Sequence, residues 1–134
     1  LSRLFFRPAL IAPDCVLRAE GAMLRGPAEI RRRTEAIRAA FSNFNIRLDQ
    51  VTVQDDWVFS RWRVGMTHTG DWMGTPPTGQ RVAAHGSTWI RVEDGMFVEG
   101  WDYWEQQQTT DALRAQENGK PRPDNGSRNS RKRP

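Results

Sequence analysis

The chain of 134 residues has a single cysteine, Cys15, so it cannot form a disulfide within itself. A lone cysteine in a strand-like segment is typically a small buried hydrophobic residue. No apolar run approaches the roughly 18 residues of a membrane-spanning helix, and the amino terminus lacks the pattern of a signal peptide. We therefore expect a cytoplasmic protein that does not enter membranes and whose core folds without disulfides.

The charge is unevenly distributed along the chain. Residues 118–134 hold six basic residues and one acid, whereas residues 1–117 hold 14 basic and 15 acidic residues. The larger part therefore has no excess positive charge of the kind that favours nucleic-acid binding. Residues 118–134 are rich in Pro, Gly, Asn, Ser and Arg, a composition typical of disorder. We expect a folded domain at 1–117 and a disordered basic tail at 118–134, the tail being the only part suited to nucleic acid.

The spacing of apolar residues changes from a helical period to a strand period along the chain. Residues 1–11 predict a short helix and residues 15–19 a short strand. Gly26-Pro27 opens a second helix, and its arginine run, residues 31–33, is expected to face solvent. Strands are then predicted at 46–54, 57–67, 81–92 and 96–105, and a last helical segment at 109–117. This order predicts an α+β domain with helices packed on one face of a curved antiparallel sheet.

Alternation along the long strands separates an apolar set of side chains from a more polar one. His68, Thr88 and Asp102 are the polar members of the apolar sets. A carboxylate among apolar neighbours is costly unless it is hydrogen-bonded, paired or protonated, and burial brings its pKa toward values useful in acid/base catalysis. Asp102 is therefore a candidate acid/base residue, and the alternatives are a satisfied structural carboxylate or a surface position. His68 is a candidate helper or a hydrogen-bonded strand-end histidine.

The loop at residues 67–79 interrupts two strand-like segments and contains three Gly and two Pro. Loops held by rigid sheets often carry function, so His68 and Asp71 are both candidate catalytic residues. Simple alternation places His68 on the apolar face and Asp71 on the other. Both can face one pocket only if the strand has a bulge or bend, for which Gly65 or Gly70 is a candidate.

Six tryptophans in one small domain are unusual. They predict core and dimer-interface packing, an aromatic wall for an apolar ligand, or both. The two histidines do not have the spacing of metal ligands, and no Gly-rich phosphate loop is present, so we expect neither a metal nor an organic cofactor. The candidate substrate-binding residues are Trp62, Met66, Trp72, Met73, Thr88 and Trp104.

Four motifs, in this order and spacing, resemble the SnoaL-like branch of the nuclear-transport-factor-2-like superfamily over roughly residues 11–107. They are Ala12-Pro13-Asp14-Cys15-Val16, Gly26-Pro27-Ala28-Glu29-Ile30-Arg31, the loop at 67–79, and the segment from Asp94-Gly95 to Gly100-Trp101-Asp102-Tyr103-Trp104-Glu105. The resemblance implies a cone-shaped barrel with an internal pocket for a small apolar molecule, and a homodimer formed through the sheet. The amino-terminal helix that usually closes such a cone is expected to be short or missing.

The resemblance also implies an enzyme of the cyclase, isomerase or hydrolase type, acting on an apolar substrate, with cyclic molecules among the candidates. The acid/base aspartate of the last strand corresponds to Asp102. Asp71 corresponds to the Asp of the Arg-x-Asp pair of limonene-epoxide hydrolases, but Thr69 replaces the Arg, and Val16 and Arg18 replace their water-holding Tyr and Asn. The catalytic base of ketosteroid isomerases would fall near Ala19 and their oxyanion-hole acid near Thr88, and neither residue in this chain matches. The alternative is a non-catalytic ligand-binding or dimerisation module of the same fold.

Overall fold

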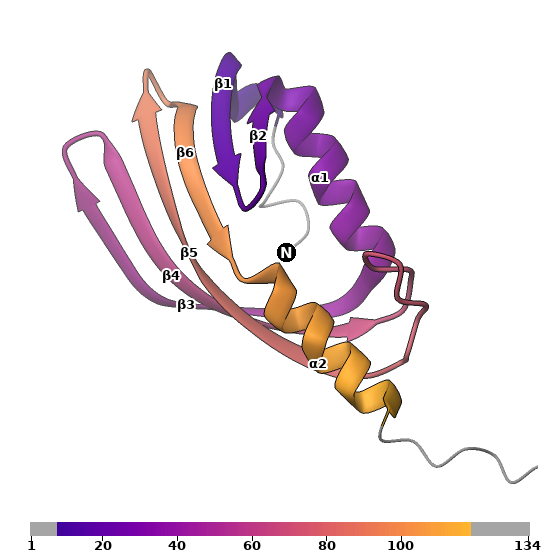
Figure 1. The fold of residues 1–134 in the computed structure, drawn as a ribbon. Coiled ribbons are helices and arrows are strands. Elements are labelled where there is room, and N and C mark those ends of the chain that lie inside the picture. Colours follow the sequence, from indigo (N-terminus) through magenta and orange to yellow (C-terminus); the bar gives the residue numbers. More distant parts are fainter. Residues whose placement is uncertain (1–7, 119–134) are drawn as a thin grey trace, which may run out of the picture.

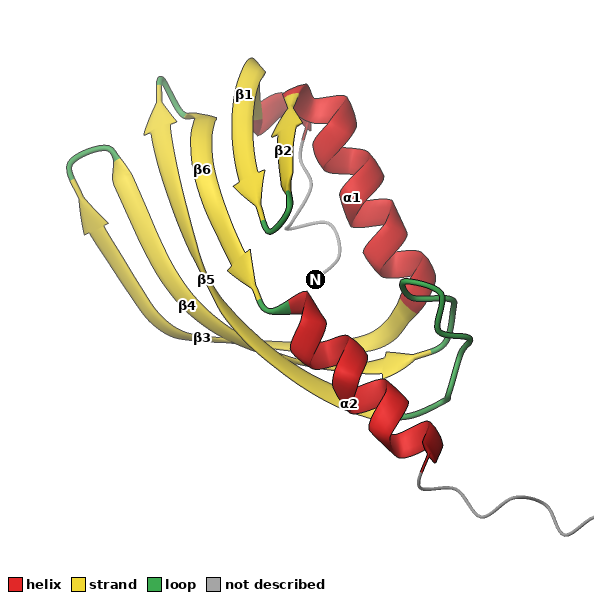
Figure 2. Cartoon of the chain, viewed as in Figure 1, coloured by secondary structure: helices red, strands yellow, loops and turns green. Residues whose placement is uncertain are grey.

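The computed structural model describes residues 8–118 (Figures 1 and 2). This part of the chain contains two α-helices and a six-stranded sheet. In chain order the elements are the 3-10 helix η1 (Pro8–Leu10), β1 (Ile11–Ala19), β2 (Ala22–Arg25), α1 (Gly26–Ala40), β3 (Phe41–Gln54), β4 (Trp57–His68), β5 (Arg81–Glu93), β6 (Met96–Trp104) and α2 (Gln106–Asn118).

The sheet has the strand order β2-β1-β6-β5-β4-β3. Strands β1 and β6 pair in parallel, and all other neighbours pair antiparallel. The sheet curves strongly, and α1 and α2 both lie on its concave side (Figure 1). These features confirm the predicted α+β cone with helices on one face. The expectation of a purely antiparallel sheet is corrected, because the parallel pairing of β1 with β6 makes the sheet mixed. The cone is not closed, because β2 and β3 are left as separate edges.

The hairpin between β5 and β6 forms as the sequence predicts. Asp94 and Gly95 both have a left-handed backbone, with φ of 52° and 74°, the conformation that a tight two-residue hairpin turn requires. The hairpin places Thr88 opposite Asp102, which makes these two residues neighbours on one face of the sheet.

Some element boundaries differ from the sequence prediction. Strand β1 begins at Ile11, and β2, which spans only Ala22–Arg25, was not predicted because four residues are too few to show a period. Strand β3 begins at Phe41, directly after α1. Of the helix expected at 1–11, residues 1–7 lie outside the described residues, Pro8–Leu10 form a 3-10 helix and Ile11 begins β1. Of the tail expected at 118–134, Asn118 ends α2 and residues 119–134 lie outside the described residues.

The register shifts do not lie at Gly65, one of the two positions where the sequence predicts a bulge or bend; besides those of β3, one lies between β5 and β6 and one between β1 and β6. Strands β4 and β5 pair in unbroken register, so there is no bulge at Gly65. Instead β3 shifts register against β4 between Ser42 and Asn45 and again between Leu48 and Gln50. Bulges increase the local twist and bend of a strand, and these two lie in the strongly curved outer pair of the sheet.

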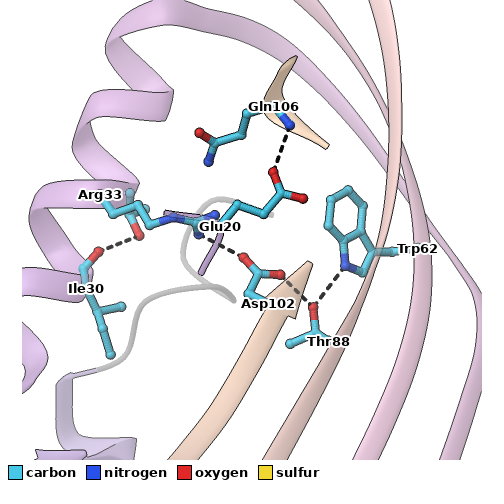
Figure 3. Close-up of polar contacts among 8 residues, drawn as sticks. Glu20, Ile30, Arg33, Trp62, Thr88, Asp102 and Gln106 are labelled. Atoms are coloured by element: carbon cyan, nitrogen blue, oxygen red, sulfur yellow. Dashed lines mark hydrogen bonds and ion pairs between the residues drawn. The ribbon is translucent and has the colours of Figure 1, made fainter. Parts of the chain in front are cut away.

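Two apolar clusters hold the layers together. One packs Ile30 of α1 against residues of β1, including Cys15 and Leu17. The other lies at the opposite end of α1, where Phe41 and Met66 pack with residues of the 69–80 loop and α2. The main-chain N–H of Gln106 also donates to the carboxylate of Glu20 at 3.1 Å, which joins the start of α2 to the end of β1 (Figure 3).

Candidate active site

A chain of hydrogen bonds crosses the concave face of the sheet and ends on helix α1 (Figure 3). The indole N–H of Trp62 donates to Thr88 Oγ1 at 2.9 Å, and the Thr88 hydroxyl donates to Asp102 Oδ1 at 2.9 Å. Arg33 Nη1 donates to the other carboxylate oxygen, Oδ2, at 2.8 Å. The structure therefore joins three predicted site residues, from β4, β5 and β6, to one that was not predicted.

The direction of each hydrogen bond follows from the chemistry of the groups. An indole N–H and a guanidinium only donate, and an ionised carboxylate only accepts. The Thr88 hydroxyl must therefore accept from Trp62 and direct its own proton to Asp102. Both Asp102 oxygens receive a donor, and each keeps one further lone pair for a third group.

Strand register and one glycine bring the chain together. Thr88 lies directly opposite Asp102, and Trp62 lies opposite Gly86. A Cβ at Gly86 would collide with the Trp62 ring and with the carbonyl oxygen of Tyr103. The absence of a side chain at this position lets the indole lie across β5 and reach Thr88.

Arg33 corrects the expectation that the whole arginine run of α1 faces solvent. Arg31 and Arg32 are exposed, whereas the Arg33 side chain is 20% exposed and contacts Asp102. A signal for this was present in the sequence: Ile30, Arg33 and Ile37 are spaced i, i+3, i+7, which places all three on one helix face. Because all three residues of the run are arginines, composition alone did not distinguish Arg33, which lies on the inner face of the helix.

Asp102 lies between the core and the solvent. Its side chain is 16% exposed, so the carboxylate is shielded but still reachable from the concave side. An ion pair in this position is screened less by water than a surface pair, and it combines a charge partner with a neutral hydroxyl donor. The arrangement holds a carboxylate in a fixed orientation with spare acceptor capacity.

His68 is fully buried at the end of β4. The main-chain N–H of Thr78 donates to His68 Nδ1 at 3.2 Å, and the Thr78 hydroxyl lies 3.0 Å from the same nitrogen. Because a main-chain N–H can only donate, Nδ1 carries the lone pair and the ring proton is assigned to Nε2. Within residues 8–118, Nε2 has no hydrogen-bond partner. His68 thus holds the loop and does not contact Asp102.

Asp71 lies on the exposed part of the loop, and its carboxylate accepts the main-chain N–H of Gly74 at 3.3 Å. This contact supports a tight turn, and Trp72 and Thr75 pair across it. Met73 is also exposed, and its sulfur accepts the Thr110 hydroxyl at 3.6 Å. The structure does not bring Asp71 or Met73 to the Asp102 carboxylate.

The remaining predicted substrate-binding residues divide into two groups. Met66, Trp72 and Trp104 are buried in the apolar cluster beneath the loop, where the two indoles stack with centroids 5.4 Å apart. Trp62 and Thr88 are partly exposed on the concave face beside Asp102. Only this second group is placed to touch a molecule bound against Asp102.

The concave face continues outward from Trp62 as an apolar surface. On β3, Leu48, Val51 and Val53 lie opposite Trp62, Ser60 and Val58, and residues that face each other across a ladder share one side of the sheet. All three β3 residues are more than half exposed. The polar chain is therefore set beside an exposed apolar surface on the same face, which suits a ligand that is mainly apolar with one polar group.

Two further observations bear on function in the described part of the chain. No helix between residues 8 and 118 is both long and apolar enough to cross a membrane. Over the same range, no three His, Cys, Asp or Glu side chains are grouped so that they could hold a metal ion.

The fold and this site define a small open α+β cone that carries a carboxylate on its concave face. The chain belongs to the SnoaL-like polyketide cyclase family, whose model matches residues 6–113. The family has a small-molecule-binding fold, and the SnoaL-like resemblance read from the sequence is confirmed. Among curated proteins, none matches the chain significantly.

Solved structures of similar proteins agree with this assignment. The hydroxylase candidate AclR from Streptomyces galilaeus is 30% identical, with a TM-score of 0.72 and 80% of each chain covered. The polyketide cyclase candidate IdmH from Streptomyces antibioticus is 26% identical, with a TM-score of 0.67, over 80% of this chain and 83% of that one. A SnoaL-like polyketide cyclase candidate from Jannaschia sp. CCS1 is 20% identical, with a TM-score of 0.74, over 80% of this chain and 75% of that one, and supports the fold alone.

Proposed function

We propose that the protein is an enzyme that performs acid/base chemistry on a small apolar substrate, with Asp102 as the group that transfers the proton. The observation that carries the proposal is the carboxylate on the concave face, oriented by Arg33 and Thr88 and 16% exposed. The exposed apolar residues of β3 lie on the same face of the sheet, and they support a mainly apolar substrate.

The reaction class that fits is abstraction of a proton next to a carbonyl group, the first step of an isomerisation or a ring closure. Asp102 would accept the proton from carbon and return it to the product, so no electrons are gained or lost. Arg33 would hold the carboxylate through Oδ2, and its positive charge would favour the negative charge that develops on the substrate oxygen. IdmH is described as a polyketide cyclase candidate, and a ring closure is one of the reactions in this class.

The proposal can be tested without knowing the natural substrate. Apolar polycyclic ketones are incubated with the protein in D₂O, and exchange of the protons next to the carbonyl is followed by NMR. We expect the wild type to accelerate exchange and Asp102→Asn to lower the rate by about 10²–10⁴-fold. The matched control is Asp111→Asn, which changes an exposed aspartate of α2 that accepts a hydrogen bond from Gln107. This variant should exchange like the wild type. Full activity in Asp102→Asn would remove Asp102 from the proposal.

The other two candidate catalytic residues are tested in the same assay. His68 is buried and bonded to Thr78, and Asp71 is exposed and bonded to Gly74. A role for either as a helper of Asp102 predicts that His68→Gln or Asp71→Asn lowers the exchange rate while substrate binding is retained. A rate equal to that of the wild type assigns that residue to the support of the loop.

The alternative is a non-catalytic ligand-binding or dimerisation module in which Asp102 is structural. The observation that favours it is the ion pair itself, because Arg33 satisfies the carboxylate within the folded chain. This alternative predicts that Asp102→Ala strongly lowers the melting temperature and that no apolar ketone shifts it. An active wild type together with a stable Asp102→Asn variant would eliminate it.

Self-association through the sheet is part of the same proposal. The convex face exposes Trp89 and Tyr103 at 50% and 53%, and the Trp89 ring packs edge-on against Phe59 at 4.9 Å. An exposed aromatic surface on a rigid sheet suits a second copy of the chain.

The cytoplasmic location expected from the sequence stays a prediction.

A further inference from the structure

A hollow of about 280 Å³ lies on the convex face of the sheet, the face opposite Asp102. Its floor contains the cross-strand pair Gly65 and Ala83, where neither residue has a side chain beyond Cβ. Three arginines line it, Arg47 from β3, Arg63 from β4 and Arg81 from β5. The hollow therefore exists because two small residues lie among long cationic ones.

The guanidinium of Arg81 is held in place by the irregular start of β3. Its Nη1 donates to the carbonyl oxygen of Asn43 at 2.6 Å and to Thr67 Oγ1 at 3.2 Å. Asn43 has a left-handed backbone, with φ of 52°, in the segment where β3 shifts register against β4. Arg81 Nη2 lies 3.0 Å from the point where a Cβ of residue 65 would be, so it lies directly over Gly65. The bulge thus positions a cation over the floor of the hollow.

The positive charge around the hollow is only partly balanced. Arg63 donates two hydrogen bonds to Asp49, at 2.8 and 2.9 Å. The bond from Arg63, together with the charges of Arg63, Arg61 and Arg47, holds the pKa of the Asp49 carboxyl below its ordinary value. Among residues 8–118, no acid pairs with Arg47 or Arg81. Two guanidinium groups therefore remain available for an anion.

We propose that this hollow binds a phosphate group, either free or carried by a small metabolite. One planar guanidinium matches a carboxylate through two parallel hydrogen bonds. Arg47 and Arg81 come from different strands and approach the hollow from different directions, with the Asp49-paired Arg63 on the strand between them, and this suits a tetrahedral oxyanion. The site lies on the face opposite Asp102, so it does not depend on the proposed acid/base function.

The test uses the full chain and inorganic phosphate at low ionic strength, where screening is weakest. Isothermal titration calorimetry should show saturable binding with a Kd of about 1 mM or below. Arg47→Gln and Arg81→Gln should each weaken binding about tenfold, because each removes a charged donor. Ala83→Leu, which fills the hollow without changing the charge, should weaken it to a similar extent. Circular dichroism establishes that each variant is folded.

The matched control is Arg61→Gln. Arg61 has the same charge, lies on the same face two residues before Arg63, and does not line the hollow. We expect Arg61→Gln to change the Kd for phosphate by about twofold or less, because Arg61 acts on the hollow only through its long-range electrostatic field. An equal effect of Arg61→Gln, or no saturable binding, would overturn the proposal. It would also be overturned if the variants altered self-association and left phosphate binding unchanged, because the hollow would then be part of an interface.

Discussion

At the scale of single residues, the concave site depends on how one arginine is oriented. Arg33 comes from a run of three arginines, yet it alone is drawn to the carboxylate of Asp102 at 2.8 Å. The neighbouring Arg32 is exposed on the same helix. Its charge, donor geometry and partial burial make Arg33 the candidate positioning residue for Asp102, because it holds one carboxylate oxygen while Thr88 holds the other.

We predict that Arg33→Gln lowers the free energy of unfolding by about 1–2 kcal/mol, since it removes a charged hydrogen bond that is shielded from water. A double-mutant cycle with Asp102→Asn, measured by urea denaturation, should give a coupling energy of about 1 kcal/mol. The control, Arg32→Gln, should change stability by less than about 0.5 kcal/mol.

The Arg33 variants can also be compared by their rates of proton exchange. If Arg33 positions the carboxylate, Arg33→Lys should restore part of the exchange rate lost in Arg33→Gln, because it returns the charge without the planar donor pair. Equal rates in Arg33→Gln and the wild type would contradict a positioning role and leave only the structural one.

At the scale of elements, the 69–80 loop is joined to the end of helix α1. The main-chain N–H groups of Thr69 and Gly70 both donate to the carbonyl oxygen of Ala40, at 2.9 and 3.0 Å. The last carbonyl groups of a helix have no partner within it, and this loop supplies two donors to one of them. A Cβ at Gly70 would collide with the carbonyl of Ala39, so the close approach requires glycine.

We predict that Gly70→Ala lowers the free energy of unfolding by about 2–3 kcal/mol, because the added methyl group forces the loop away from α1. Amide hydrogen exchange followed by NMR should show loss of protection at the N–H groups of positions 69 and 70. The comparison is Gly74→Ala in the same loop, where φ is +81° but no heavy atom lies within 4 Å. Gly74→Ala should lower the free energy of unfolding by about 1 kcal/mol, because alanine disfavours this backbone conformation. A larger loss in Gly74→Ala would show that the contact with α1 does not hold the loop.

At the scale of the whole molecule, the curved sheet separates two surfaces with different chemistry. The concave face combines the Asp102 site with exposed apolar residues of β3, such as Leu48 and Val53. The convex face combines exposed aromatic residues with the arginine-lined hollow. Because side chains alternate along every strand, one sheet can carry both surfaces without interference between them.

We predict that the double variant Trp89→Ser/Tyr103→Ser abolishes self-association. Light scattering after size-exclusion chromatography should change from about twice the chain mass of 15.4 kDa to the mass of one chain. The matched control is Leu48→Ser/Val53→Ser, which removes exposed apolar side chains from the concave face and should leave the dimer intact. Dissociation by the control alone would place the interface on the other side of the sheet.

Features that depend on residues close together in the sequence were predicted, and features that depend on pairing with distant residues were not. The Asp94-Gly95 hairpin was predictable because a two-residue turn needs a left-handed backbone at both positions. The bulges of β3 and the short strand β2 were not, because each depends on pairing with another strand rather than on a local period. Asp102 was found from alternation, since its neighbours at i±2 are apolar.

The sequence by itself determined the fold family, the face on which Asp102 lies and the absence of an intrachain disulfide. The fold family follows from the resemblance of four motifs to SnoaL-like proteins, whereas the α+β class, the face of Asp102 and the absence of a disulfide follow from local periodicity, turn chemistry and composition. Only the tertiary structure decided that Arg33 is the partner of Asp102, that His68 and Asp71 lie away from it, and that Arg47, Arg63 and Arg81 surround one hollow. These relations join residues up to 69 positions apart, and they arise from strand register and curvature, which no local pattern encodes.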